Sequence, residues 1–202
     1  FKELKSKYPH GLLSVPVVGA GTVNTEFEVL TGMSVHDFGT GEYPYKSILG
    51  KTTCESIAYI LKNSGYTAHA LHNNNGTFYS RNDVYKNLGF DTFTSVEYMS
   101  NTEYTETGWA KDSVLTSEIM GALNSTDSRD FVFAVSVQAH GKYPDEYTPE
   151  DGDPRVLSGI PADDIDTISA YNYYLKQLDE MDDFIKELCD SVLAFDEPTV
   201  LV

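Results

Sequence analysis

Hydrophobic positions recur along the chain at two spacings, which predict helices and strands in alternation. The longest stretch at a spacing of three to four residues predicts one amphipathic helix over about 163–189. Its apolar positions are Ile165, Ile168, Tyr171, Leu175, Leu178, Met181, Ile185 and Leu188. A shorter stretch predicts a helix over 114–123. The nearly continuous apolar run 131–137 is typical instead of a parallel strand buried on both faces.

Polar and glycine residues mark the ends of further elements. Capping-box spacing, in which serine or threonine precedes an acid by three residues, predicts two helix starts. The two pairs are Thr52 with Glu55, and Ser80 with Asp83. The helices that they begin are expected to end at Gly65 and Gly89. Short strands are predicted at 66–71, 90–93 and 199–202, and short helices at 1–8 and 24–33.

The alternation of these elements predicts an α/β fold, a mostly parallel sheet sandwiched by helices, with ligands at the carboxyl ends of strands. A length of 202 residues allows one sizeable core, so the simplest organisation is a single domain over 1–202. No apolar run is long enough to span a bilayer, and the first residues do not resemble a signal peptide. The chain stops on an apolar run without a turn, so we expect a piece of a longer protein, truncated at both ends.

Composition narrows the class of protein and of partner. A hydrophobic content of 41% with 12% aromatic residues indicates a globular protein. The 14 basic and 31 acidic side chains give a net charge of −17, which opposes docking on nucleic acid or on an anionic membrane. An anionic lipid substrate would therefore need local positive charge or a metal. Cys54 and Cys189 allow one disulfide bridge, although two unpaired cysteines are the simpler expectation.

The stretch 19–32 is where we place the chemistry. Its glycines let backbone N–H groups approach a ligand, and the amphipathic positions that follow predict a loop that feeds a helix N-terminus, a natural anion site. The hydroxyl of Thr22 could accept a phosphoryl or sulfuryl group there if a metal or base lowered its pKa. The alternative is that Thr22 or Asn24 is only a helix N-cap.

Two later segments carry side chains suited to a phosphate. The guanidinium of Arg81, at a predicted helix start, matches phosphate oxygens in a bidentate manner. His72 follows the strand 66–71, and His140 follows the run 131–137, where an imidazole could protonate a leaving group. The alternatives are a surface arginine and strand-end histidines. His69, inside its predicted strand, is expected to be structural.

In this order along the chain, the segments resemble the lipoteichoic acid synthase and phosphoglycerol transferase branch of the sulfatase and alkaline phosphatase superfamily. Gly21-Thr22-Val23-Asn24-Thr25-Glu26-Phe27 is similar to the nucleophile segment, which implies that Thr22 is the catalytic nucleophile and a metal ligand. The segment 71–82 is similar to the one lining the glycerophosphate pocket, and His140 to the histidine after a later strand, which implies catalysis by His140. The implied substrate-binding residues are His72, Asn74, Phe78, Tyr79 and Arg81.

Asn74 stands where an acid is usual in this family, and Tyr79 where a tryptophan is usual. The resemblance implies an alkaline-phosphatase-like fold and a metal-dependent enzyme that uses Mn²⁺ or Mg²⁺. Most of the family's metal ligands would lie outside this chain, so the piece by itself is expected to be inactive. Glu26 and Glu28 could replace them, but a helix of this kind normally turns such residues to solvent or to a cap.

The implied reaction moves glycerophosphate from phosphatidylglycerol, an anionic glycerophospholipid, through Thr22 to a glycan or polyglycerophosphate acceptor. The alternatives are a hydrolase of the sulfatase or phosphodiesterase type and a catalytically silent extracytoplasmic binding domain. The implied location is the bacterial cell envelope, as the extracytoplasmic domain of a membrane protein whose missing part contacts the membrane. No nucleic acid partner is expected.

Overall fold

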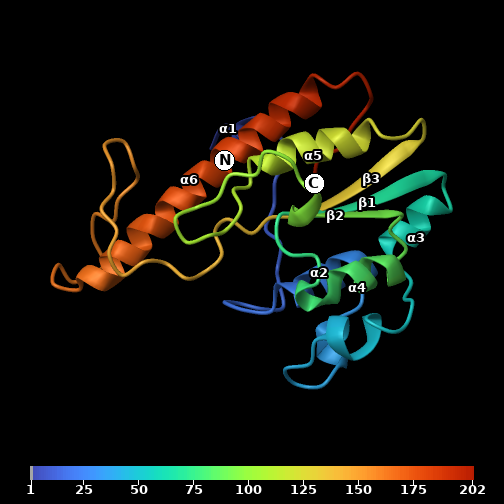
Figure 1. The fold of residues 1–202 in the computed structure, drawn as a ribbon, viewed down its shortest axis with the longest axis horizontal. Coiled ribbons are helices and arrows are strands. Elements are labelled where there is room, and N and C mark those ends of the chain that lie inside the picture. Colours follow the sequence, from blue (N-terminus) through green and yellow to red (C-terminus); the bar gives the residue numbers. More distant parts are fainter. Residues whose placement is uncertain (1) are drawn as a thin grey trace. The chain divides into compact units, whose positions relative to one another are not determined.

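The computed structural model describes residues 2–202, which form two compact units (Figure 1). The first unit contains the chain up to Leu71, then Asn75–Thr94 and Ala122–Phe133. The second contains His72–Asn74, Ser95–Gly121 and Ala134–Val202. Each unit carries a separate part of the predicted site.

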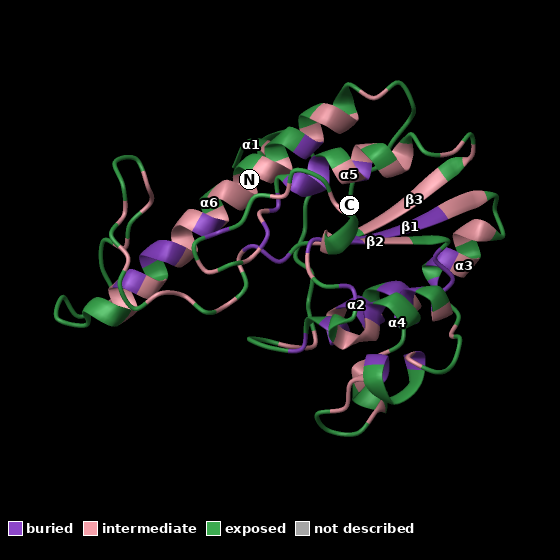
Figure 2. Ribbon diagram, in the orientation of Figure 1, coloured by how far each residue is buried: buried purple, intermediate pink, exposed green. Residues whose placement is uncertain are grey.

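Three parallel strands form the sheet, in the order β2-β1-β3, which confirms the α/β class. The strands are β1 (Tyr66–His72), β2 (Thr92–Ser95) and β3 (Arg129–Val135). The central strand β1 is buried from Ala68 onward, as Figure 2 shows. β3 lies at an edge of this sheet and is mostly half-buried, so the prediction of burial on both faces is wrong. The predicted strand 199–202 is irregular and exposed.

A continuous apolar core joins the sheet to the helices α2 (Thr22–Thr31), α3 (Ile57–Lys62), α4 (Arg81–Asn87) and a π-helix at Tyr45–Leu49. The first unit also contains α1 (Lys2–Lys7), which has no buried residue. Phe27 and Leu30 of α2, Val84 and Tyr85 of α4, and Ala68 of β1 share this core. Full burial of each large apolar side chain contributes about 1.5–3 kcal/mol, so this core holds α2 and α4 in place.

The second unit contains two helices that the apolar spacing predicted. They are α5 (Val114–Leu123) and α6 (Ile165–Leu193). Asp164 caps α6 by accepting a hydrogen bond from the backbone N–H of Thr167. Long periodic stretches are the most reliable signal in a sequence because their burial is set by the helix period itself.

Short elements differ from the predicted capping boxes. Ser56, not Thr52, caps α3, because its hydroxyl accepts a hydrogen bond from the Tyr59 N–H and donates one to the Leu88 carbonyl. Ser80 precedes α4, but its backbone is left-handed and its side chain makes no capping bond. Neither Thr22 nor Asn24 caps α2, so the alternative reading of the glycine loop is wrong.

Candidate functional site

Gly21 fixes how Thr22 is presented. Gly21 is the N-cap of α2 with φ of 79°, a conformation that glycine adopts without strain. A Cβ atom at Gly21 would lie 3.0 Å from Cε1 of Tyr43, so the backbone also approaches this ring closely. Thr22 is consequently the first helical residue, and its side chain is exposed. An exposed hydroxyl at a helix N-terminus stands where backbone N–H groups favour an anion.

One turn along α2, Glu26 is buried and binds Arg81 of α4. The Glu26 Oε1 atom lies 2.5 Å from Arg81 Nη2, and Oε2 lies 3.2 Å from Nε. The hydroxyls of Tyr45 and Tyr85 donate to the same Oε2 atom at 3.2 and 2.9 Å. The expectation that Glu26 faces solvent or a cap is therefore wrong, because four donors surround it in the core.

The charges in this cluster shift the pKa values of its members. Burial raises the pKa of Tyr45 and of Tyr85, and the negative charge of Glu26 raises both further. Burial by itself would lower the pKa of Arg81, but the hydrogen bond and charge of Glu26 outweigh it and raise this pKa. Both tyrosines therefore stay neutral donors, and Arg81 stays a cation.

The link before α4 is strained. Tyr79 and Ser80 both have left-handed backbones, with φ of 58° and 55°, although neither is glycine. Such residues cost of order 1 kcal/mol each and persist where surrounding contacts over-determine them. The Tyr79 ring lies 4.6 Å from the Phe78 ring and 5.8 Å from the Tyr43 ring, and the Arg81 guanidinium lies 5.6 Å from its centre.

These contacts close a ring around the start of α2. Gly21 approaches Tyr43, the Tyr43 and Tyr79 rings pack together, and Tyr79 covers Arg81. Arg81 in turn binds Glu26 of α2, which lies one helical turn after Thr22. The first unit therefore brings three predicted site residues, Thr22, Tyr79 and Arg81, into one constellation. Phe78, also predicted, lies beside it with 49% of its surface exposed.

The other predicted site residues belong to the second unit. His72 ends β1, is buried, and its Nδ1 atom lies 2.8 Å from the carbonyl oxygen of Val135. Asn74 is half-buried, and its carbonyl accepts a hydrogen bond from the N–H of Val96. His140 is exposed, with its ring centre 4.5 Å from that of Trp109. The imidazole of His140 is thus accessible for proton transfer, whereas that of His72 is fixed by the backbone.

A buried polar network in the second unit was missed by the sequence analysis. Asp112 has no exposed surface. Its Oδ1 atom accepts hydrogen bonds from Asn73 Nδ2 at 2.8 Å and from the backbone N–H groups of Val137 and Gln138 at 3.2 Å. Burial raises the pKa of this carboxyl despite those donors. The network fixes the chain just before His140.

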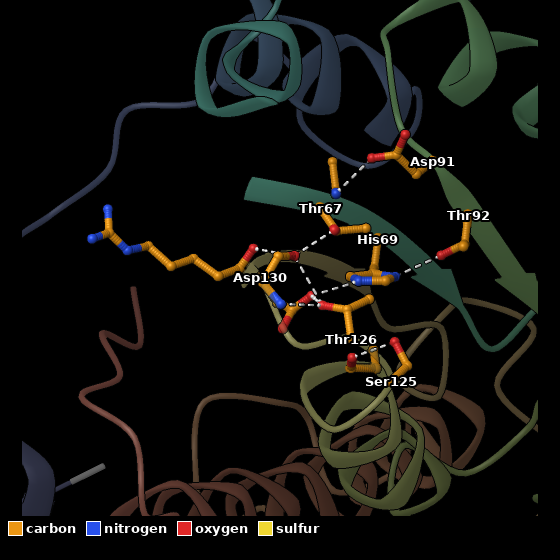
Figure 3. A network of polar contacts seen from close by, with 11 residues as sticks. Thr67, His69, Asp91, Thr92, Ser125, Thr126 and Asp130 are labelled. Carbon is orange, nitrogen blue, oxygen red and sulfur yellow. Dashed lines mark hydrogen bonds and ion pairs between the residues drawn. The ribbon is translucent and has the colours of Figure 1, made fainter. Parts of the chain in front are cut away.

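A second network crosses the three strands (Figure 3). His69 on β1 places Nδ1 at 2.8 Å from the Thr92 hydroxyl on β2 and Nε2 at 3.0 Å from Asp130 Oδ1 on β3. The Thr126 hydroxyl donates to the same Asp130 atom. These bonds join all three strands, which agrees with the structural role expected for His69. Its partners are distant in sequence, so periodicity alone could not have found them.

The described residues do not complete a metal centre. Within 2–202, no group of three or more His, Cys, Asp or Glu side chains could hold a metal ion. In the same range, no helix is both long and apolar enough to cross a bilayer. Cys54 and Cys189 are free thiols, as expected, and burial raises the pKa of each.

Comparison with known proteins gives a family for this arrangement. The family model described as Sulfatase matches residues 1–202. A candidate cyclic beta-1,2-glucan modification protein of Rhizobium meliloti (strain 1021) is 33% identical over 187 residues, 93% of this chain and 28% of that protein. Lipoteichoic acid synthase 2 of Bacillus subtilis (strain 168) is 30% identical over 125 residues, 61% of this chain and 18% of that protein. The chain thus spans less than a third of the length of these two relatives.

Solved structures share the fold at lower sequence identity. The phosphoglycerol transferase GacH of Streptococcus pyogenes, in complex with sn-glycerol-1-phosphate, matches 97% of this chain and 50% of its own with a TM-score of 0.78 and 20% identity. The C-terminal periplasmic domain of EcEptC from Escherichia coli, in complex with Zn, matches 86% of this chain and 45% of its own with a TM-score of 0.56 and 20% identity. These likenesses show that the chain shares the α/β fold of these two proteins.

Proposed function

Since the chain belongs to the sulfatase family of the alkaline phosphatase superfamily, we propose that it is part of a phosphoglycerol transferase whose nucleophile is Thr22. The observation that carries the proposal is the contact ring of the first unit. It exposes the Thr22 hydroxyl at the start of α2 and holds the Arg81 guanidinium one turn along the same helix. The ring thus fixes the nucleophile beside the buried pair of Glu26 and Arg81, and fixed positioning of the reacting group is a large part of catalysis of phosphoryl transfer.

The proposed reaction has two steps. In the first, the Thr22 oxygen loses its proton and bonds to the phosphorus of phosphatidylglycerol, while the bond from phosphorus to the diacylglycerol oxygen breaks. The diacylglycerol oxygen takes up a proton and leaves as an alcohol, and glycerophospho-threonine remains. In the second, an acceptor hydroxyl loses its proton, bonds to the phosphorus and releases Thr22 as a hydroxyl.

The remaining predicted residues have roles in this proposal. In the first unit, Arg81 and Tyr79 are proposed to recognise the phosphate and Phe78 the glycerol or acyl portion. For His72 and Asn74, which belong to the second unit, the family resemblance alone supports a role toward the headgroup. For His140, also in the second unit, the family resemblance supports a role as proton donor to the leaving diacylglycerol, and its imidazole is exposed. Mn²⁺ or Mg²⁺ is proposed as the cofactor, with Thr22 as its ligand in this chain. When bound, the metal would supply Lewis acidity, but the described residues do not fit a metal centre by themselves.

A glycan is the acceptor that the comparisons favour. The relative that matches 93% of this chain is named for modification of a glucan, and the lipoteichoic acid synthase matches 61%. We therefore place transfer to a glycan ahead of transfer to growing polyglycerophosphate. The solved EcEptC domain is periplasmic, and with it and the family resemblance in mind we propose an extracytoplasmic location in the cell envelope, as part of a membrane-anchored protein. Transfer to water, as in a phosphodiesterase, uses the same first step.

Intact-protein mass spectrometry tests the nucleophile and the donor together. The full-length protein containing this chain is incubated with Mn²⁺ and phosphatidylglycerol, beside its Thr22→Ala variant and a Thr25→Ala control on the same helix. We expect a glycerophosphoryl adduct in the wild type and in Thr25→Ala but not in Thr22→Ala. EDTA added before the lipid should prevent its formation. A folded wild-type protein with bound Mn²⁺ and no adduct would contradict the proposal.

A further inference from the structure

The positive charge of Arg81 is compensated inside the protein. Only 2% of the Arg81 surface is exposed, and Glu26 binds two of its three guanidinium nitrogens. The net charge of the chain is −17, so an anionic headgroup meets a repulsive field on approach. The pair of Glu26 and Arg81 has no net charge and cannot offset that repulsion. A second cation without a counter-charge at this site would offset it.

Lys46 provides that cation. It belongs to the π-helix Tyr45–Leu49, a rare form of helix that is frequent at functional sites. Its Nζ atom lies 4.9 Å from the centre of the Tyr79 ring and 5.3 Å from that of Tyr43. Lys46 is exposed, and among residues 2–202 no carboxylate forms an ion pair with it.

The neighbouring residue of the π-helix explains why Lys46 stays in this position. Tyr45 is fully buried and its hydroxyl donates to Glu26, so the π-helix is tied to the same carboxylate that holds Arg81. Lys46, next in the chain, is exposed where Tyr45 is buried. Tyr79, whose ring lies near both Nζ of Lys46 and the Arg81 guanidinium, has a strained backbone held by these contacts.

We propose that Lys46 is a second phosphate-recognising residue of the Thr22 site. It provides the uncompensated positive charge that attracts the phosphate of an anionic glycerophospholipid headgroup, while the Tyr43 and Tyr79 rings keep its side chain near the site. An ammonium on a flexible stem can follow a mobile headgroup, whereas Arg81 is fixed in the core. This inference rests on the proposed function.

Steady-state kinetics of the full-length protein with Mn²⁺ and phosphatidylglycerol vesicles tests the inference. For Lys46→Gln we expect a KM for the donor raised five- to tenfold with kcat within twofold, and for Lys46→Arg a value near the wild type. Lys51→Gln, which removes an exposed lysine just after the π-helix, is the matched control and should leave KM unchanged. High salt should narrow the difference in KM between the wild type and Lys46→Gln, because salt screens the exposed charge that distinguishes them.

The outcomes separate the inference from the proposed function. An adduct on Thr22 with the same KM in Lys46→Gln as in the wild type would overturn the role of Lys46 and leave the function intact. An equal rise in KM for Lys51→Gln would also overturn it, since the effect would then belong to overall charge. If the wild-type protein forms no adduct, both the proposed function and the role of Lys46 are contradicted. The thermal midpoint of Lys46→Gln should match the wild type because the side chain is exposed.

Discussion

The carboxylate of Glu26 binds the guanidinium of Arg81 at 2.5 Å, with both side chains buried. This pair joins the helix that begins at Thr22 to the first residue of α4. A buried ion pair is weak evidence for stability, because desolvation offsets most of its attraction. Its geometric effect is more direct: with Tyr45 and Tyr85 on the same carboxylate, Arg81 has one orientation relative to Thr22.

Removing the charge of Glu26 should destabilise the protein strongly. Glu26→Gln leaves the buried Arg81 cation without its counter-charge, for which we expect a loss of about 3–5 kcal/mol in the free energy of unfolding. Tyr85→Phe removes one donor to Glu26 and should cost about 1–2 kcal/mol. Urea denaturation measures both. Glu55→Gln, at an exposed position, is the control and should stay within about 0.5 kcal/mol.

A cost for Glu26→Gln no larger than that of Glu55→Gln would show that Arg81 finds other partners. The position of Arg81 would then not depend on α2. In that case the argument that one helix positions both the nucleophile and the phosphate-binding cation would fail.

Alanine variants of two glycines with nearly the same φ distinguish the cost of a left-handed backbone from the cost of a steric clash. Gly19 and Gly21 have φ of 77° and 79°, but only a Cβ at Gly21 meets Tyr43. Gly19→Ala should therefore cost only the left-handed penalty, about 1 kcal/mol. Gly21→Ala should cost more and slow adduct formation on Thr22, because Tyr43 must move. Thermal unfolding and the rate of adduct formation measure the two effects, and equal behaviour of the variants would contradict the close approach.

The free energy of unfolding of the wild type and that of the nearly isosteric variant Asp112→Asn should differ by an amount that depends on pH. Burial raises its pKa in the folded protein, so the ionised form is penalised there. The penalty is absent below the unfolded pKa near 3.8, grows as the pH rises through the folded pKa, and is complete above it. Asp112→Asn removes it while keeping an oxygen that can accept the Asn73 bond. We expect Asp112→Asn to be more stable than the wild type at pH 7.

Chemical denaturation of both proteins between pH 4 and 7 tests this expectation. The stability difference should shrink towards zero at the acid end, where Asp112 of the wild type is protonated. Other carboxylates titrate in both proteins and cancel in the difference. A difference that stays constant with pH would show that its origin is packing instead of ionisation.

The polar network of His69, Thr92 and Asp130 should stabilise the sheet, because the contact between His69 and Asp130 is buried. Asp130→Asn replaces the acceptor of His69 Nε2, leaves this buried contact weakened, and should cost about 1–3 kcal/mol. Asp127→Asn, on the exposed turn before β3, is the matched control and should have little effect. Thermal unfolding compares them. Equal stabilities would mean that the strands do not depend on the contact between His69 and Asp130.

The sequence alone determined the elements whose burial follows a local period. The helix 114–123 and the long helix beginning near Ile165 were predicted from spacing, because one buried stripe fixes each of them, although the long helix continues beyond the predicted end to Leu193. The strand beginning at Tyr66 was also predicted, and it is buried on both faces from Ala68 onward. The α/β class and the family followed from their order and from the short segment around Thr22. These properties depend on residues close together in the chain.

Only the tertiary structure decided which polar groups are buried together. Glu26 and Arg81 are 55 positions apart, and His69 and Asp130 are 61 apart, so no local sequence pattern predicts either contact. The same holds for β3, whose apolar run reads as fully buried although it lies at an edge of this sheet. A charged side chain can be buried only where its counter-charge and donors are brought to it, and folding of distant segments supplies them.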